Sequence, residues 1–311
     1  MKFKKAVLVN ISDSDFDQKY WDELDELVDT RVSLNRDDPK LMDELKDCDV
    51  LMLGFQVPTA KDIFDAAPNL KLVNILATAY GTVDIEEASK RGIPVCNLAG
   101  YSTESVAEFT ISALLTEMRS IPEGLARAKA GNYSFEGIRA RELKGSSFGV
   151  IGLGSIGNRV AELAAGFGAN VSYWSHSKKD SPFTAVELDE LLSTCDFISV
   201  NVAENEDTIG LLNDKNLPLI KPDSILISTV PPSVIDTDAL VKRLEKEDMV
   251  YISDHPNEMT QEELSILNEL DNCIFYPAIA FLSDEARIAK QEIFIANMQG
   301  LLDGSVQNKV N

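Results

Sequence analysis

Cysteine and histidine are scarce in this sequence, and their scarcity limits the chemistry that it can support. The four cysteines lie far apart with no CxxC spacing, and only two histidines are available to join them. A zinc site or a disulfide framework needs a denser set of ligands, so we expect neither, and we expect no bound metal. Unpaired thiols are typical of a reducing compartment, which favours a cytoplasmic location. The four are Cys48, Cys96, Cys195 and Cys273.

Long hydrophobic runs are also missing. No stretch approaches the roughly 18 apolar residues that a membrane-spanning helix requires, so we expect no membrane partner of that kind. Lysines precede the apolar run 6–9 near the N-terminus. This run is too short for a signal peptide and leads into no small-residue cleavage site, so it predicts a first β-strand instead.

Basic residues are much fewer than acidic residues. The chain has 29 lysines and arginines against 51 aspartates and glutamates, which gives a formal net charge of −22. Such a surface would repel nucleic acid and anionic membranes, and we expect neither as a partner. The simplest interpretation of the acidic excess is a solvated surface.

The sequence does contain a repeated α/β rhythm, and its 311 residues are enough for two cores. Strand-like apolar runs alternate with helical patterns, as in parallel sheets built from βαβ units. The first series occupies 6–11, 49–54, 70–77 and 93–98. The second series begins near Ser146 and occupies 147–154, 170–175, 196–202, 224–229, 249–253 and 273–277.

Two longer helical segments frame the second series. Residues 102–133 have apolar residues at helical spacing, with Ser102 or Thr103 as a plausible N-cap. Pro122 is expected to end or kink this segment. The last segment, 283–304, predicts a single amphipathic helix.

A glycine motif follows the first strand of the second series and opens a helix. Gly152, Gly154 and Gly157 have the G-x-G-x-x-G order. In this motif the first glycine permits a tight turn, the second lets the backbone approach a pyrophosphate, and the third allows close packing of helix on strand. We therefore predict dinucleotide binding by these glycines and by Ser155 and Ile156 at the helix N-terminus. The alternative is a glycine-rich packing turn.

The next strand should end beside the adenosine ribose. NAD-binding folds usually place an acidic residue there, but Asp180 comes too late in the sequence. The strand instead ends in hydroxyls, an imidazole and lysines, namely Ser175, His176, Ser177, Lys178 and Lys179. These groups would bind a 2′-phosphate, so we favour NADP over NAD as the cofactor. In the alternative interpretation, the two lysines are solvated loop charges.

Four motifs in order carry a more specific signal: "RGIPVCNLAGYSTESVAEFT", "ELKGSSFGVIGLGSIGNRVAELAAGFG", "VIDTDALVKRL" and "YPAIAFLSDEA". Through them the chain resembles, over nearly its full length, the D-2-hydroxyacid dehydrogenase family, which includes glycerate dehydrogenase, hydroxypyruvate reductase and phosphoglycerate dehydrogenase. The resemblance implies an α/β fold of two Rossmann-like domains with doubly wound parallel sheets. A flavodoxin-like substrate domain would comprise 1–99 and 286–311, and an NAD(P)-binding domain, 100–285, would be inserted into it.

The resemblance also implies a homodimer formed largely through the cofactor domains, including the helix after Ser102. A small 2-oxo or 2-hydroxy acid would bind between the two domains. Its carboxylate would contact the backbone of a loop in 77–84, and the cofactor would contact the ends of the later strands. The residues implied are Ala79, Tyr80 and Gly81 for the substrate, and Thr229, Val230 and Asp254 for the cofactor.

The resemblance fails at the catalytic positions. Pro231 occupies the register of the family's arginine, which holds the substrate, and Ala278 that of the histidine, which exchanges the proton. The family's glutamate falls on Met259, or on Glu258 if one residue is deleted. Losing a charge-assisted contact costs roughly 1.5–3 kcal/mol, and losing a general acid costs roughly 10²–10⁴ in rate. Turnover by the usual mechanism is therefore not expected.

Other residues are weak candidates for the missing roles. His255 follows Asp254, and the pair could form an acid with its orienting partner. The simpler interpretation is a loop histidine next to Pro256. Tyr276 could donate a proton or simply pack against the second domain, and Glu258 is a third candidate. These observations leave three hypotheses. The chain is an oxidoreductase with a non-standard catalytic set, a catalytically silent dinucleotide-binding member, or a structural relic that has lost its ligand.

Overall fold

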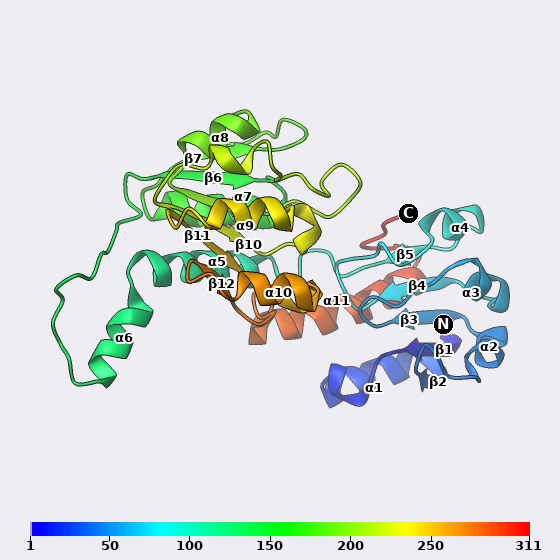
Figure 1. Ribbon diagram of the computed structural model, residues 1–311. Helices are drawn as coiled ribbons and strands as arrows, with labels where there is room; N and C mark the ends of the chain where they lie inside the picture. The colour runs from blue at the N-terminus through cyan, green and yellow to red at the C-terminus, as the bar shows by residue number, and fades with distance from the viewer. Residues whose placement is uncertain (1) are drawn as a thin grey trace. The chain divides into compact units, whose positions relative to one another are not determined.

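The computed structural model describes residues 2–311, which divide into two α/β units (Figure 1). The first unit combines the two ends of the chain, Met1–Ser102 and Ser283–Asn311, and the second is Thr103–Leu282. The boundaries expected from the sequence lie a few residues from these at both junctions.

The first unit contains a five-stranded sheet in which all neighbouring strands are parallel, in the order β2-β1-β3-β4-β5. This is the doubly wound order of flavodoxin-like folds, as expected. The strands are β1 (Phe3–Val9), β2 (Val28–Leu34), β3 (Val50–Leu53), β4 (Leu72–Ile75) and β5 (Val95–Cys96).

Side chains that point alternately to the two faces of this sheet contribute to two separate hydrophobic cores. Val7 and Val9 face one core, while Ala6 and Leu8 face the other, because successive strand residues point to opposite faces. The first core is covered by α2 (Leu41–Glu44), α3 (Lys61–Ala66) and α4 (Ile85–Lys90). The second is covered by α1 (Gln18–Leu27) and the C-terminal α11 (Asp284–Leu302).

The second unit contains a seven-stranded parallel sheet in the order β12-β11-β10-β9-β6-β7-β8. This arrangement confirms the predicted Rossmann-like sheet, and the strand order reverses between β6 and β9. The strands are β6 (Ser147–Ile151), β7 (Asn170–Trp174), β8 (Thr184–Ala185), β9 (Phe197–Val200), β10 (Ser224–Ser228), β11 (Met249–Ser253) and β12 (Cys273–Phe275).

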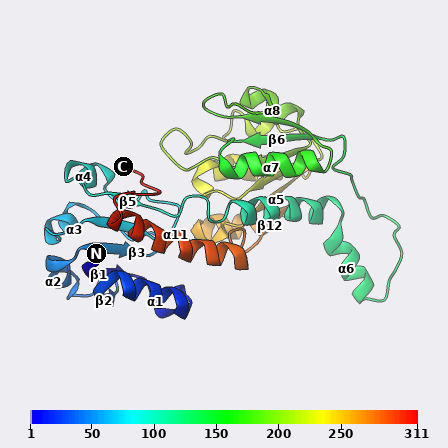
Figure 2. The same cartoon turned by 180° about the vertical axis from the view of Figure 1, so that it is seen from behind.

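Helices cover both faces of this sheet. Ile198 and Leu226 face one core, and Phe197 and Ile225 face the other. The first core is covered by α8 (Leu188–Thr194), α9 (Thr237–Leu244) and α10 (Gln261–Leu267). The second is covered by α5 (Thr103–Met118) and α7 (Ser155–Gly166), which lie side by side on this face in Figure 2.

Three local expectations differ from the structure. Both β2 and β8 are edge strands that were not expected: exposed polar residues conceal the pattern of β2, and β8 is too short to show one. Pro122 neither ends nor kinks a continuous helix. The chain turns at Ser120, whose φ is +50°, and Pro122 lies in the first turn of α6 (Ile121–Lys129). Backbone N–H groups in a first turn have no acceptor within the helix, so the missing N–H of proline costs no hydrogen bond there.

None of the helices in residues 2–311 combines the length and the apolar character that crossing a bilayer would demand. Over the same residues, no group of three or more His, Cys, Asp and Glu side chains is arranged to hold a metal ion. The four cysteines are unpaired. Burial raises the pKa of the Cys48 and Cys273 thiols to about 12.

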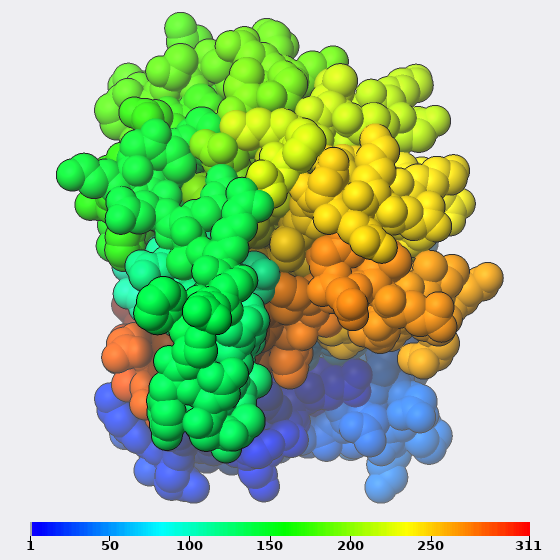
Figure 3. Space-filling view, turned by 60° about the vertical axis from the view of Figure 1, so that its left-hand side comes forward, coloured from blue at the N-terminus to red at the C-terminus, as the bar shows by residue number. Residues whose placement is uncertain are grey.

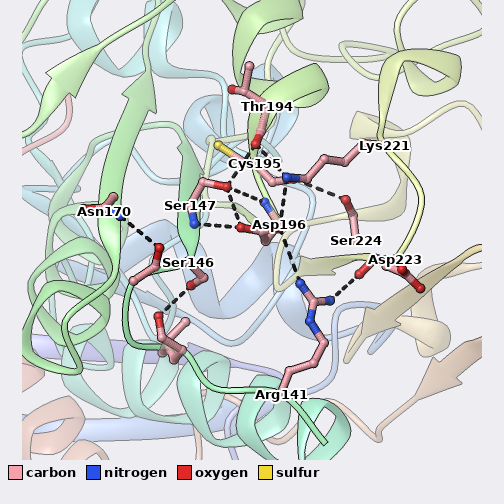
Figure 4. A network of polar contacts seen from close by, with 12 residues as sticks. Arg141, Ser146, Ser147, Asn170, Thr194, Cys195, Asp196, Lys221, Asp223 and Ser224 are labelled. Atoms are coloured by element: carbon pink, nitrogen blue, oxygen red, sulfur yellow. Dashed lines mark hydrogen bonds and ion pairs between the residues drawn. The ribbon is translucent and has the colours of Figure 1, made fainter. Parts of the chain in front are cut away.

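A polar network fixes the N-terminal edge of the second sheet (Figure 4). The Asp196 carboxylate lies 2.9 Å from Lys221 Nζ and 3.5 Å from an Arg141 nitrogen. It also accepts hydrogen bonds from the backbone N–H and the hydroxyl of Ser147, at 2.8 and 2.7 Å. Burial alone would raise the pKa of Asp196, but the bonds from Lys221 and Ser147 lower it to about 2.

We expect Asp196→Asn to lower the free energy of unfolding at neutral pH by on the order of 1–2 kcal/mol, because a carboxylate with a depressed pKa stabilises the folded state. This contribution is present above the unfolded-state pKa near 3.8 and is lost as the pH falls toward about 2. Urea unfolding of both proteins between pH 7 and pH 2 measures it.

The matched control is Asp214→Asn, which removes an exposed carboxylate that forms no ion pair within residues 2–311. We expect this variant to unfold like the unmodified protein. If the stability difference between Asp196→Asn and the unmodified protein were the same at pH 7 and pH 2, the network would not depend on the ionised carboxylate.

Candidate dinucleotide-binding and catalytic site

The loop between β6 and α7 gives each motif glycine a different steric environment. Gly152 has a φ of +94°, and an added Cβ would lie 2.7 Å from Val202. An added Cβ at Gly157 would lie 1.9 Å from the carbonyl oxygen of Gly152. At Gly154, by contrast, no atom lies within 4 Å of an added Cβ. The loop is therefore tightly packed at two glycines and open at the third.

The open side of the loop lies at the N-terminus of α7. Gly154 is the N-cap residue and has no side chain to accept from the first helical N–H groups, which belong to Ser155, Ile156 and Gly157. Unsatisfied N–H groups and the helix dipole favour an anion at this point. The site therefore fits a dinucleotide pyrophosphate.

The end of β7 lies beside this loop, because the Gly152 N–H donates to the carbonyl oxygen of Trp174 at 2.8 Å. Ser175 is half-buried, while His176, Ser177 and Lys178 are exposed. The residues up to Lys179 include no carboxylate, and Asp180 is exposed further along. The tip therefore presents hydroxyls and basic groups.

The end of β10 contains the two prolines that replace the expected basic residue. Thr229 is half-buried and Val230 is buried directly after the strand. Pro231 then precedes a short 3₁₀ turn, Pro232–Val234, and its carbonyl oxygen accepts from the Val234 N–H at 3.2 Å. These prolines build a tight turn and supply no charge.

The end of β11 holds a carboxylate and imidazole pair. Asp254 is 1% exposed, and one of its oxygens lies 2.8 Å from Nδ1 of His255. The other oxygen accepts from the Ala280 N–H at 2.9 Å. Burial alone would lower the pKa of His255, but the hydrogen bond and charge of Asp254, with the charge of Glu258, raise it above its usual value.

The other catalytic candidates are placed differently. The Tyr276 ring packs edge-on against Phe109 of α5, with ring centroids 5.4 Å apart, which favours a packing role. Glu258 is exposed at the end of the 3₁₀ turn Pro256–Glu258, and its N–H donates to the carbonyl oxygen of His255 at 3.2 Å. Ala278 is half-buried and has no ionisable group.

In the first unit, the predicted substrate loop follows β4. Ala79, Tyr80 and Gly81 are exposed, and no acceptor within residues 2–311 engages their backbone N–H groups. The base of the loop is fixed, because the Thr78 carbonyl oxygen accepts from the Asn97 amide at 2.7 Å. Free N–H groups on a fixed loop suit a carboxylate ligand.

Sequence reasoning missed one participant, the Ala280 N–H that holds the second oxygen of Asp254. A backbone donor leaves no signal in residue type, so only the path of the chain after β12 identifies it.

A G-x-G-x-x-G turn where the strand order of a parallel sheet reverses defines a dinucleotide-binding α/β protein. Residues 111–280 match the model of the D-isomer specific 2-hydroxyacid dehydrogenase NAD-binding domain. The chain belongs to this family of oxidoreductases, and its cofactor is a nicotinamide dinucleotide.

Similar proteins support this assignment. A glyoxylate reductase of Thermococcus litoralis is 31% identical over 287 residues, covering 87% of this chain and 86% of the relative. Another from Pyrococcus furiosus is 28% identical over 313 residues, covering 96% and 90%. A D-lactate dehydrogenase of Aquifex aeolicus, solved with NAD and lactic acid, has a TM-score of 0.85 at 26% identity, covering 98% of each chain.

We expect Gly154→Val to weaken NADPH binding at least tenfold without unfolding the protein, because its side chain would occupy the open face where a pyrophosphate fits. Isothermal titration calorimetry measures the change. The matched control is Gly166→Ala at the end of α7, where an added Cβ also meets no atom within 4 Å. Equal affinity in both variants would place the phosphates elsewhere.

Proposed function

We propose that this protein is an NAD(P)-dependent oxidoreductase that interconverts a small carbonyl compound and the corresponding hydroxy acid, using a non-standard catalytic set. The observation that carries the proposal is the G-x-G-x-x-G loop, tightly packed at Gly152 and Gly157 and open at Gly154, in a member of this family. If the turn served only to pack the helix against the strand, the space around Gly154 would not need to be empty.

The residues that would hold the cofactor follow the edge of the second sheet. Gly154, Ser155 and Ile156 would hold the pyrophosphate, and the end of β7 would hold the adenosine. Thr229, Val230 and Asp254 would lie along the nicotinamide half, because each half of such a sheet takes one nucleotide. When bound, the reduced nicotinamide supplies the hydride for the carbonyl carbon.

A small acid is the substrate class that the first unit fits. The free N–H groups of Ala79, Tyr80 and Gly81 are positioned to bind a carboxylate, as a domain taking the substrate would require. The similar proteins named above, a glyoxylate reductase and a D-lactate dehydrogenase, point to 2-oxo and 2-hydroxy acids. Residues 1–99 with 286–311 would then be the substrate domain, and residues 100–285 the cofactor domain.

The test is a binding titration followed by a turnover assay. NADPH and NADH are titrated separately, and glyoxylate, longer 2-oxo acids and uncharged carbonyls are then added while nicotinamide absorbance is followed. We expect binding together with oxidation of the cofactor by at least one carbonyl. Tight binding without turnover would support the silent, dinucleotide-binding alternative, which Pro231 and Ala278 favour.

We further propose NADP as the preferred cofactor, with NAD as the alternative, because the end of β7 carries basic groups and hydroxyls. Lys178→Glu should weaken NADPH binding by about tenfold, the loss of one charge-assisted contact, and should leave NADH binding within about twofold. Lys215→Glu, an exposed lysine elsewhere on the second unit, is the charge-matched control. A parallel loss for both nucleotides would argue against a 2′-phosphate site.

A homodimer is proposed from the surface of the second unit. The helix α6 has no buried residue and extends away from the sheet, and Figure 3 shows the green segment that includes it as an exposed ridge. Leu125 is 57% exposed there, and Tyr133 and Phe135 follow at 84% each. A groove of about 540 Å³ between α5 and α7, lined by Leu115 and Phe167, could receive this ridge from a second copy.

We expect Leu125→Glu to shift the protein from dimer toward monomer in sedimentation velocity runs over a range of concentrations, because it places a charge in an apolar contact. Lys129→Gln changes the net charge by the same amount on the same exposed helix and should not affect assembly. A dimer equally stable in both variants would exclude the ridge from the interface.

A further inference from the structure

We propose that His255 is the proton donor for carbonyl reduction and that Asp254 is its positioning residue, so that the end of β11 replaces the missing family histidine. The proposal rests on the function proposed above and names the group within that site that moves the proton.

Position is the first observation. The glycine loop assigns the pyrophosphate to the end of β6, and the β7 side takes the adenosine, which leaves the nicotinamide half to β9, β10, β11 and β12. His255 is the only basic side chain among the residues that follow these strands, which are 201–204, 229–232, 254–258 and 276–280. His255 is therefore the one basic side chain at these strand ends that could serve a reaction at the nicotinamide.

Hydrogen bonding is the second observation. An ionised carboxylate only accepts hydrogen bonds, so the 2.8 Å contact with Asp254 requires a proton on Nδ1 of His255. The Ala280 N–H holds the other oxygen of Asp254, so the carboxylate cannot rotate freely. Nε2 has no partner within residues 2–311 and remains available to carry a transferable proton. Asp254 thus orients the ring as a carboxylate orients a catalytic imidazole.

Burial of the ring opposes its protonation, but the charged groups around it favour the protonated imidazole. Asp254 is buried and Glu258 is exposed on the same segment, and both favour the protonated ring. The segment that packs on Asp254, 276–281, has Tyr276 as its only ionisable side chain, and its ring faces Phe109. The end of the neighbouring β10, 229–232, has no ionisable group. No cation therefore competes with His255 locally.

The chemistry balances with these groups. As hydride reaches the carbonyl carbon, the C–O π-bond breaks and its electron pair moves to oxygen. The Nε2–H bond of His255 breaks, its proton forms the new O–H bond, and the neutral ring is then reprotonated from solvent. The carbonyl is reduced, the nicotinamide is oxidised, and one proton is consumed per turnover. In the reverse direction His255 accepts the proton.

The first measurement is kinetic. In the assay with NADPH and whichever carbonyl is turned over, His255→Gln should lower kcat by about 10²–10⁴-fold while the NADPH dissociation constant stays within about twofold. Gln retains a hydrogen bond to Asp254, which protects the fold. Asn257→Ala, the exposed neighbour, should behave like the unmodified protein. Asp254→Asn should lower kcat and move the alkaline limb of the kcat profile to lower pH.

The second measurement needs no turnover. The chain has only two histidines, so NMR of ¹³C-labelled histidine gives two ring signals, and His176→Gln assigns them. The oxidised nicotinamide ring is cationic and the reduced ring is neutral. The pKa of His255 should therefore be lower with NADP⁺ bound than with NADPH bound, because a nearby like charge disfavours protonation. A histidine with only a packing role, distant from the nicotinamide, would titrate identically in both complexes.

The outcomes separate the two proposals. If the unmodified protein reduces no carbonyl, the proposed function fails, and the proton-donor role fails with it. If it turns over, but His255→Gln is equally active or the two complexes titrate alike, the role of His255 is overturned while the oxidoreductase stands. Loss of kcat with unchanged NADPH affinity and a cofactor-dependent pKa supports both.

Discussion

The close approach of α7 to the turn after β6 is the constraint on which the proposed site depends. Because Gly157 has no Cβ, its backbone lies against the carbonyl oxygen of Gly152, and the helix begins directly at the edge of the sheet. Any side chain at Gly157 would push the helix away and separate its free N–H groups from the strand ends. The tight turn, the N-terminal end of the helix dipole and the place where the strand order reverses are therefore found together.

The architecture could be predicted from sequence because parallel sheets leave a strong periodic signal. In β10 the central residues 225–227 are all apolar and the whole strand is buried, since both of its faces are covered. β2 could not be predicted in this way, because an edge strand with exposed polar residues such as Asp29 and Thr30 resembles a loop. Pro122 was misjudged because a proline that interrupts one helix also suits the first turn of the next.

Only part of the candidate site could be predicted from the sequence. Gly152 and Gly157 perform steric tasks that only glycine can perform, so their spacing identifies them. The pairing of Asp254 with His255 was a weak candidate in the sequence, because adjacent residues often point apart. Its geometry depends on the Ala280 N–H, a backbone group brought in from the other side of β12. Tyr276 was another weak candidate, and its ring contact with Phe109 favours the packing alternative.

The first unit is completed by the last part of the chain. Asn74 of β4 donates to the carbonyl oxygen of Phe294 and accepts from Asn297, both in α11 and both buried with it. During synthesis the apolar face formed by Leu8, Met52 and their neighbours must wait for α11 to leave the ribosome, whereas residues 103–282 are already complete. The second unit can therefore fold first, and until α11 is synthesised the growing chain exposes the part of this sheet face that α1 does not cover.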